Sequence, residues 1–93
     1  MHIRWTAQAV SDIQALRSYV EQDKPLAAKK LVLKIISLIE EDLILQPGMG
    51  RPGRKVGTRE LIIPSTPYFV PYRIKGDTIE VVRVLHGAMQ WSW

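Results

Sequence analysis

The residues whose types could support chemistry are basic, and they gather in the second half of the chain. Residues 51–93 contain seven Lys or Arg and three Asp or Glu, whereas residues 1–50 contain six of each. Guanidinium groups bind phosphates and carboxylates and stabilise transition-state charge, and a histidine transfers protons near neutral pH. Such residues could bind an acidic partner or cleave RNA without a metal ion. The candidates are Arg51, Arg54, Lys55, Arg59, Arg73, Arg83 and His86.

Two parts of this basic set have a second interpretation. Arg83 shares strand parity with Val81 and Leu85, so it could instead be a buried arginine with a structural ion-pair partner. The run Gly50-Arg51-Pro52-Gly53-Arg54-Lys55 also fits an extended arginine-proline insert for the narrow minor groove of DNA. Both alternatives stay open at this point.

Residue patterns for other kinds of chemistry are missing from the sequence. The chain has no cysteine, which excludes disulfides, thiol catalysis and cysteine-based metal sites. Its only histidines, His2 and His86, stand in separate strand-like segments, so we expect neither a metal site nor a cofactor. It also lacks a nucleophile elbow, a Walker loop and a dinucleotide-binding glycine motif. The acidic residues 40–42 are adjacent on a helix, where side chains point in different directions, so we interpret them as a solvated face.

Length and composition limit the organisation of the chain. Ninety-three residues, of which 46% are hydrophobic and 24% charged, are typical of one folded domain, which we expect to span residues 1–93. The net charge of +4 comes wholly from the second half and suggests an acidic partner. The first residues lack the features of a signal peptide, and apolar runs such as 43–45 are too short to cross a bilayer. We therefore expect a cytoplasmic protein that does not associate with membranes.

The first half of the chain predicts a strand and two helices. Residues 2–5 alternate polar and apolar side chains, and Thr6 is a suitable N-cap for a helix of about four turns. Apolar residues then recur at helical spacing until Asp23-Lys24-Pro25. Asp23 is the expected N-cap of a second helix, which continues to Leu43 and stops before residue 47. The short connection predicts an antiparallel helical hairpin.

The second half predicts a loop and three strands. Glycine and proline alternate with basic residues over 46–58, so we expect no regular structure there. Strands are expected at 59–63, 68–74 and 79–85, and Pro71 indicates an edge or a bulge in the second of them. The order is β-α-α-β-β-β. This order predicts an α+β fold with the helical hairpin packed on one face of an antiparallel sheet.

Some apolar residues exceed what the core of such a fold needs. On the second helix Leu33, Ile36 and Ile44 widen the apolar arc, and they could complete the core or line a groove for a partner. Trp91 and Trp93 could be interface anchors, because exposed tryptophans dominate many protein interfaces. Trp91 could alternatively fold back onto the sheet as a lid.

Several blocks of the sequence point to a known family. They are Met49-Gly50-Arg51-Pro52-Gly53-Arg54, Gly57-Thr58-Arg59-Glu60-Leu61, Pro67-Tyr68-Phe69-Val70, Tyr72-Arg73-Ile74 and Arg83-Val84-Leu85-His86-Gly87-Ala88, with Trp91. Together they resemble the ParE toxins of the RelE/ParE superfamily, from bacterial type II toxin–antitoxin modules. The resemblance covers nearly the whole chain and implies the β-α-α-β-β-β fold expected above. It also implies a growth-inhibiting toxin that a co-expressed, ParD-like antitoxin neutralises.

The superfamily divides into two mechanisms, and the resemblance bears on the choice. RelE-like members cleave messenger RNA on the ribosome with basic residues on the strands that correspond to 59–63 and 68–74. This chain has Glu60, Ile62 and Phe69 at those places, and neither a carboxylate nor an apolar side chain stabilises phosphorane charge. We therefore expect the ParE-like mechanism, which is poisoning of DNA gyrase without catalysis. The alternative is an endoribonuclease that uses His86 and Arg83, because some nuclease branches carry a catalytic histidine near this position.

The resemblance and the charge pattern together predict two contact surfaces. The target-binding residues expected for gyrase are Arg51, Arg54, Lys55, Arg59, Arg83, His86, Trp91 and Trp93. The antitoxin-binding residues expected are Leu33, Ile36, Ile44 and Arg73. Nucleic acid would then be contacted only indirectly. A third class, a basic nucleic-acid-binding module, predicts that the isolated chain binds DNA or RNA with a steep salt dependence.

Overall fold

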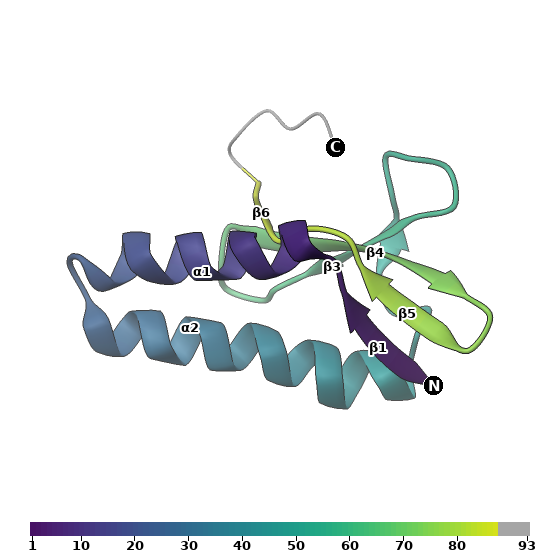
Figure 1. Cartoon of the computed structure of the whole chain (residues 1–93), viewed down its shortest axis with the longest axis horizontal. Helices are drawn as coiled ribbons and strands as arrows, with labels where there is room; N and C mark the ends of the chain where they lie inside the picture. Colours follow the sequence, from purple (N-terminus) through teal and green to yellow (C-terminus); the bar gives the residue numbers. More distant parts are fainter. Residues whose placement is uncertain (88–93) are drawn as a thin grey trace.

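The computed structural model describes residues 1–87 and confirms the predicted α+β fold (Figure 1). The elements are β1 (His2–Trp5), α1 (Ala7–Glu21), α2 (Pro25–Ser37), the π-helical turn η1 (Leu38–Leu43), β2 (Arg51–Pro52), β3 (Arg59–Ile62), β4 (Tyr68–Lys75), β5 (Thr78–Val81) and β6 (Leu85–His86). Figure 1 shows α1 and α2 side by side as a hairpin. In the part of the chain that the structure describes, no helix has the length and apolar character needed to cross a membrane.

The two helices begin for different physical reasons. The Thr6 hydroxyl accepts a hydrogen bond of 3.0 Å from the Ala9 amide, which confirms the predicted N-cap of α1. The prediction that Asp23 caps α2 is wrong, because the capping position is Lys24 and no side chain caps this helix. Pro25 starts α2 instead, since its fixed φ is already helical and its missing N–H would have no partner in the first turn.

The sheet is mixed rather than wholly antiparallel. Its strands lie in the order β1-β5-β4-β3-β2, with β6 added to β4 beside β5. All other pairs are antiparallel, but β1 runs parallel to β5. The expectation of no regular structure over residues 46–58 is also wrong, because β2 pairs with the start of β3.

The predicted strand 79–85 is interrupted by a bulge. Tyr72 of β4 pairs with Val81, but the next residue back along β4, Pro71, has no N–H to continue the ladder. The Pro71 carbonyl instead accepts hydrogen bonds from the amides of both Val82 and Arg83, at 2.9 and 3.4 Å. Pairing resumes one residue out of phase, with Leu85 opposite Phe69. The bulge that Pro71 predicted is therefore present, and it divides the last strand into β5 and β6.

Alternation along the strands separates the sheet into two faces. One face packs on the helices, which contribute Ala9, Leu16, Ile35, Ile39 and Leu43 to the core. The strand residues of this core are Leu61, Ile63, Val70, Tyr72, Ile79 and Val81, with Ile3 and Trp5 packed against them. The opposite face carries cross-strand partners of opposite charge. We call this opposite face the charged face; its charged residues are Arg4, Arg51, Arg54, Glu60, Arg73, Lys75 and Glu80.

Candidate functional site

The basic loop, residues 51–58, is attached to the charged face through Glu60. The Glu60 side chain is only 1% exposed. Its Oε1 accepts hydrogen bonds from Nε and Nη2 of Arg51, at 3.2 and 2.9 Å, and its Oε2 accepts one of 3.1 Å from the Arg54 amide. The Arg54 guanidinium lies 5.2 Å from the centre of the Phe69 ring, in cation–π geometry. Both arginine side chains stay about half exposed, at 54% and 52%.

A second buried carboxylate repeats this arrangement on the same face. Glu80 of β5 binds Arg4 of β1 at 2.7 Å and Arg73 of β4 at 2.5 Å. The hydrogen bond from Arg73 lowers the pKa of Glu80, and the positive charges of Arg73 and Arg4 add to this shift against the opposing effect of burial. The four arginines and two carboxylates that are paired on the charged face carry a net charge of +2, and Lys75 beside them adds to the positive charge. An anionic partner can bind the outward N–H groups of these arginines.

The segment that leads into the loop, residues 47–50, is fixed by a buried tyrosine. The Tyr72 hydroxyl donates a hydrogen bond of 2.6 Å to the Pro47 carbonyl and accepts one of 2.9 Å from the Gly50 amide. Burial raises the pKa of Tyr72, although the Gly50 hydrogen bond and the Arg59 charge oppose that rise. Arg59 donates to the carbonyls of Gly48 and Gly50, at 3.2 and 2.7 Å, so part of its hydrogen-bonding capacity holds the loop in place.

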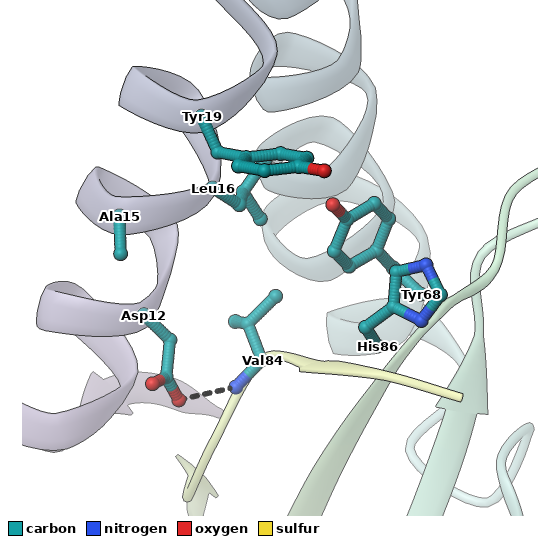
Figure 2. Close-up of a pocket in the computed structure, with 7 residues that line it drawn as sticks. All are labelled: Asp12, Ala15, Leu16, Tyr19, Tyr68, Val84 and His86. Carbon is teal, nitrogen blue, oxygen red and sulfur yellow. Dashed lines mark hydrogen bonds between the residues drawn. The ribbon is translucent and has the colours of Figure 1, made fainter. Parts of the chain in front are cut away.

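An apolar groove of about 590 Å³ lies on the other face, between α1 and the strands β4 and β6 (Figure 2). Figure 2 shows Tyr19 of α1 and Tyr68 of β4 turned toward each other across it. Tyr68 also meets His86 edge to face, at 5.2 Å between ring centres. Burial raises the pKa of Tyr68, and Tyr19 adds to the shift. The lining residues are Asp12, Ala15, Leu16, Tyr19, Tyr68, Val84 and His86.

Arg83 is held at the edge of this groove by Asp12. Its Nε and Nη2 donate to the Asp12 carboxylate at 2.7 and 3.0 Å, and the Val84 amide donates to the same carboxylate at 3.0 Å. The hydrogen bond that Arg83 donates to Asp12 raises the pKa of Arg83 despite desolvation. The two side chains are 19% and 17% exposed. This geometry agrees with the interpretation of Arg83 as a paired structural arginine.

The structure therefore separates residues that the sequence places in one set. Arg51, Arg54 and Arg73 belong to the charged face, whereas Arg83 and His86 lie beside α1 on the opposite face. Lys55 lies in the exposed turn of the loop, where its carbonyl accepts bonds from the Thr58 amide and hydroxyl. Among residues 1–87 no three acidic or histidine side chains gather closely enough to bind a metal ion.

Comparisons with known proteins agree with this fold. Residues 3–91 match the model of the ParE toxin of the type II toxin–antitoxin system parDE. The chain is 40% identical to the Sinorhizobium fredii protein Y4kP over 89 residues, which cover 96% of this chain and 91% of the relative. The chain belongs to the ParE toxin family. It is a toxin of the ParE/RelE type from a type II toxin–antitoxin system.

Solved structures place this ParE-family chain among toxins studied with their antitoxins. The chromosomal ParDE system of Pseudomonas aeruginosa contains a chain with a TM-score of 0.81 and 28% identity, covering 92% of this chain and 95% of that one. The toxin–antitoxin complex RelBE2 of Mycobacterium tuberculosis contains a chain with the same fold, at a TM-score of 0.67 and 24% identity, covering 91% and 95%. Homologues of this toxin have thus been crystallised in complex with cognate antitoxins.

The residues predicted to contact the antitoxin do not form one surface. Leu33 on α2 is 54% exposed, whereas Ile36 and Ile44 are half-buried. Arg73 lies on the charged face and is bound to Glu80. The predictions for Trp91 and Trp93 concern residues outside those that the structure describes.

Sequence reasoning did not identify the groove residues Tyr19 and Tyr68. Tyr19 lies three residues after Leu16 and seven after Asp12, which is a helical spacing. That spacing could have indicated one exposed aromatic face on α1. The position of Tyr68 opposite this face follows only from the topology of the sheet.

Proposed function

We propose that this ParE-family toxin acts in the cytoplasm by binding DNA gyrase and trapping its cleaved complex with DNA, without catalysis of its own. The single observation that carries this proposal is that the sheet separates the loop arginines Arg51 and Arg54 from His86. A surface that presents arginines without a nearby proton-transfer group suits docking to an acidic partner better than chemistry. The docking surface in this proposal is the basic loop, with Arg51, Arg54 and Lys55 at its centre.

The nuclease alternative loses support from the same geometry. In-line cleavage of RNA needs a proton-transfer group and a stabiliser of phosphorane charge within reach of one phosphate. His86 contacts Tyr68 on the helix side, while Arg51 and Arg54 are bound to Glu60 on the charged face. Arg83, the other residue proposed for catalysis, is paired with Asp12. The sheet therefore separates His86 from Arg51 and Arg54, and Asp12 already engages the Arg83 guanidinium, so the geometry favours docking over cleavage.

A cognate antitoxin of the ParD type is the second partner in this proposal. Leu33 and Ile36 on α2 offer apolar contact area, and Arg73 offers a charged contact on the opposite face. A partner segment would have to wrap around the toxin to reach both. The groove beside Tyr19 is large enough to accept an apolar side chain of that segment.

A gyrase assay with a matched pair of arginine variants tests the proposal. We expect the purified chain to inhibit supercoiling and to accumulate cleaved DNA, and the antitoxin to reverse both effects. Arg54→Gln removes an outward charge of the loop, and we expect it to raise the inhibitory concentration about tenfold or more, as for a central interface charge. Arg17→Gln is the control, because the Arg17 side chain is 62% exposed, against 52% for Arg54, and pairs with Glu21 on α1, away from the loop.

Three results would contradict the proposal, each in a different way. If the wild-type chain arrests growth but leaves gyrase unaffected while messenger RNA is cut on ribosomes, the toxin is an endoribonuclease. If the isolated chain binds DNA or RNA tightly with a steep salt dependence, it is a nucleic-acid-binding module. If Arg54→Gln and Arg17→Gln inhibit gyrase equally well, the basic loop is not the docking surface.

A further inference from the structure

We infer that Glu60 is a positioning residue that holds the basic loop, residues 51–58, in the shape it presents to its target. The inference rests on the proposed function, in which this loop is the docking surface. Glu60 lies in β3 outside the loop, and its side chain is almost fully buried. It is therefore not a contact residue and acts only through the residues it binds.

The contacts of Glu60 join parts of the loop that differ in conformation. Its Oε1 holds the side chain of Arg51, which is in β2, and its Oε2 holds the main-chain amide of Arg54, which lies beyond the end of β2. One carboxylate thus sets both the direction of the Arg51 guanidinium and the path of the backbone that carries Arg54.

Residues 51 and 52 of the loop pair with β3, whereas the other hydrogen bonds within residues 53–58 act locally. The Gly53 amide donates to the Thr58 carbonyl at 2.8 Å, and Thr58 donates to the Lys55 carbonyl through its amide and its hydroxyl. These bonds close the turn upon itself and leave its orientation toward the sheet open. The hydrogen bond that the Arg54 amide donates to Glu60 ties this turn to a side chain of β3.

The chemistry of the site requires a carboxylate rather than an amide. All three groups that point at Glu60 are N–H donors, and an ionised carboxylate is an acceptor at both oxygens. A glutamine of the same shape would turn its NH₂ group toward either Arg51 or Arg54 and leave that donor without an acceptor. The negative charge also allows the two guanidinium groups to lie close together, because it offsets their mutual repulsion.

Glu80 provides a matched control on the same face. It is similarly buried and also binds two arginines, but those are Arg4 and Arg73, which lie outside the loop. Replacing either glutamate by glutamine therefore removes one buried charge from the same face, and in each case two arginines lose their carboxylate partner. Only the Glu60 variant disturbs the loop.

The experiment measures hydrogen exchange of individual amides by NMR in the wild-type chain, Glu60→Gln and Glu80→Gln. We expect the Arg54 amide to exchange about tenfold to a hundredfold faster in Glu60→Gln, as expected for loss of a hydrogen bond to a charged acceptor. In Glu80→Gln we expect the same amide to keep its wild-type rate. The concentration of Glu60→Gln that inhibits gyrase should rise about tenfold, after correction for the folded fraction.

A measurement on the wild-type chain keeps the inference testable if Glu60→Gln does not fold. The Arg54 amide should exchange at least about tenfold more slowly than that of Val56, whose side chain is fully exposed at the tip of the loop. Equal rates for these two amides would overturn the inference, as would equal effects of the two glutamine variants on Arg54. A loosened loop with unchanged gyrase inhibition would overturn it as well. If the wild-type chain itself fails to inhibit gyrase, the proposed function fails, and the exchange contrast alone decides the role of Glu60.

Discussion

Removal of the Asp12 carboxylate should destabilise this protein more than any exposed charge change. The Asp12→Ala variant leaves the Arg83 guanidinium without its carboxylate and the Val84 amide without its acceptor. Both members of the pair are less than one-fifth exposed. The free energy lost on breaking this pair should therefore lie between two limits. A surface ion pair contributes at most about 1 kcal/mol, and breaking a fully buried pair costs about 3–5 kcal/mol.

The expected loss of stability follows from these limits. In Asp12→Ala we assign a loss of about 2 kcal/mol to the Arg83 charge that no longer has this carboxylate. The Val84 amide, which loses its acceptor, adds about 1 kcal/mol. The free energy of unfolding should thus fall by about 3 kcal/mol in Asp12→Ala. For a domain of this size the melting temperature should fall by about 12–24 °C.

Urea denaturation followed by circular dichroism measures this loss. The control is Glu21→Ala, which removes the exposed Arg17–Glu21 pair of the same helix and should cost less than about 0.5 kcal/mol beyond helix propensity. In the double variant Asp12→Ala/Arg83→Met the stranded charge is gone, so part of the stability should return.

Two results would refute this reasoning. If Asp12→Ala loses less than about 1 kcal/mol, Arg83 has found water or another partner and the pair has no structural role. If the double variant is as unstable as the sum of the two single variants, the two side chains do not interact energetically. A stable Arg83→Met variant that no longer inhibits gyrase would return Arg83 to the target-binding residues.

Two further predictions concern other buried contacts. Gly50→Ala should lower the free energy of unfolding by about 2 kcal/mol or more, because the added Cβ would lie 2.6 Å from a ring carbon of Tyr72. Gly48→Ala is the control and should be near neutral, because its Cβ would meet nothing within 4 Å. Urea denaturation measures both variants, and equal effects would contradict this prediction. Hydrogen bonding from Arg73 lowers the pKa of Glu80 in the folded state, so the unfolded state takes up the proton more readily and stability is lost as the pH falls below about 4.5. In Glu80→Gln the melting temperature should therefore fall less steeply than in the wild type as the pH is lowered below about 4.5. An unchanged slope would show that Glu80 does not contribute to this loss of stability in acid.

Local features of the sequence were sufficient to predict much of the fold. The helical spacing of apolar residues predicted both helices, and Thr6 predicted the start of the first, because both signals depend on neighbours within one turn. Alternation predicted the strands, and Pro71 predicted a bulge because a proline has no N–H to donate. The block from Met49 to Ala88 was specific enough to indicate the family.

Long-range pairing was beyond the reach of these signals. The helical hairpin returns the chain so that β1 lies parallel to β5, whose residues pair with those 76 positions earlier, and no local pattern records such a separation. The Arg54 amide is bound by Glu60, which lies six residues away along the chain, and the sequence shows Glu60 only as a carboxylate where the nuclease branch has a basic residue. Its role in shaping the loop depends on its burial, which follows from the packing of the sheet.

The position of His86 shows the division between sequence and tertiary structure most directly. The composition and spacing of the chain determined that arginines and one histidine occupy its second half. Uninterrupted alternation from Val81 would have placed His86 on the charged face beside the arginines. The bulge at Pro71 inserts one residue into this strand and shifts the alternation, so that His86 pairs with Tyr68 and faces α1. The sequence thus supplied the chemical groups, and only the register of two strands decided which of them can act together.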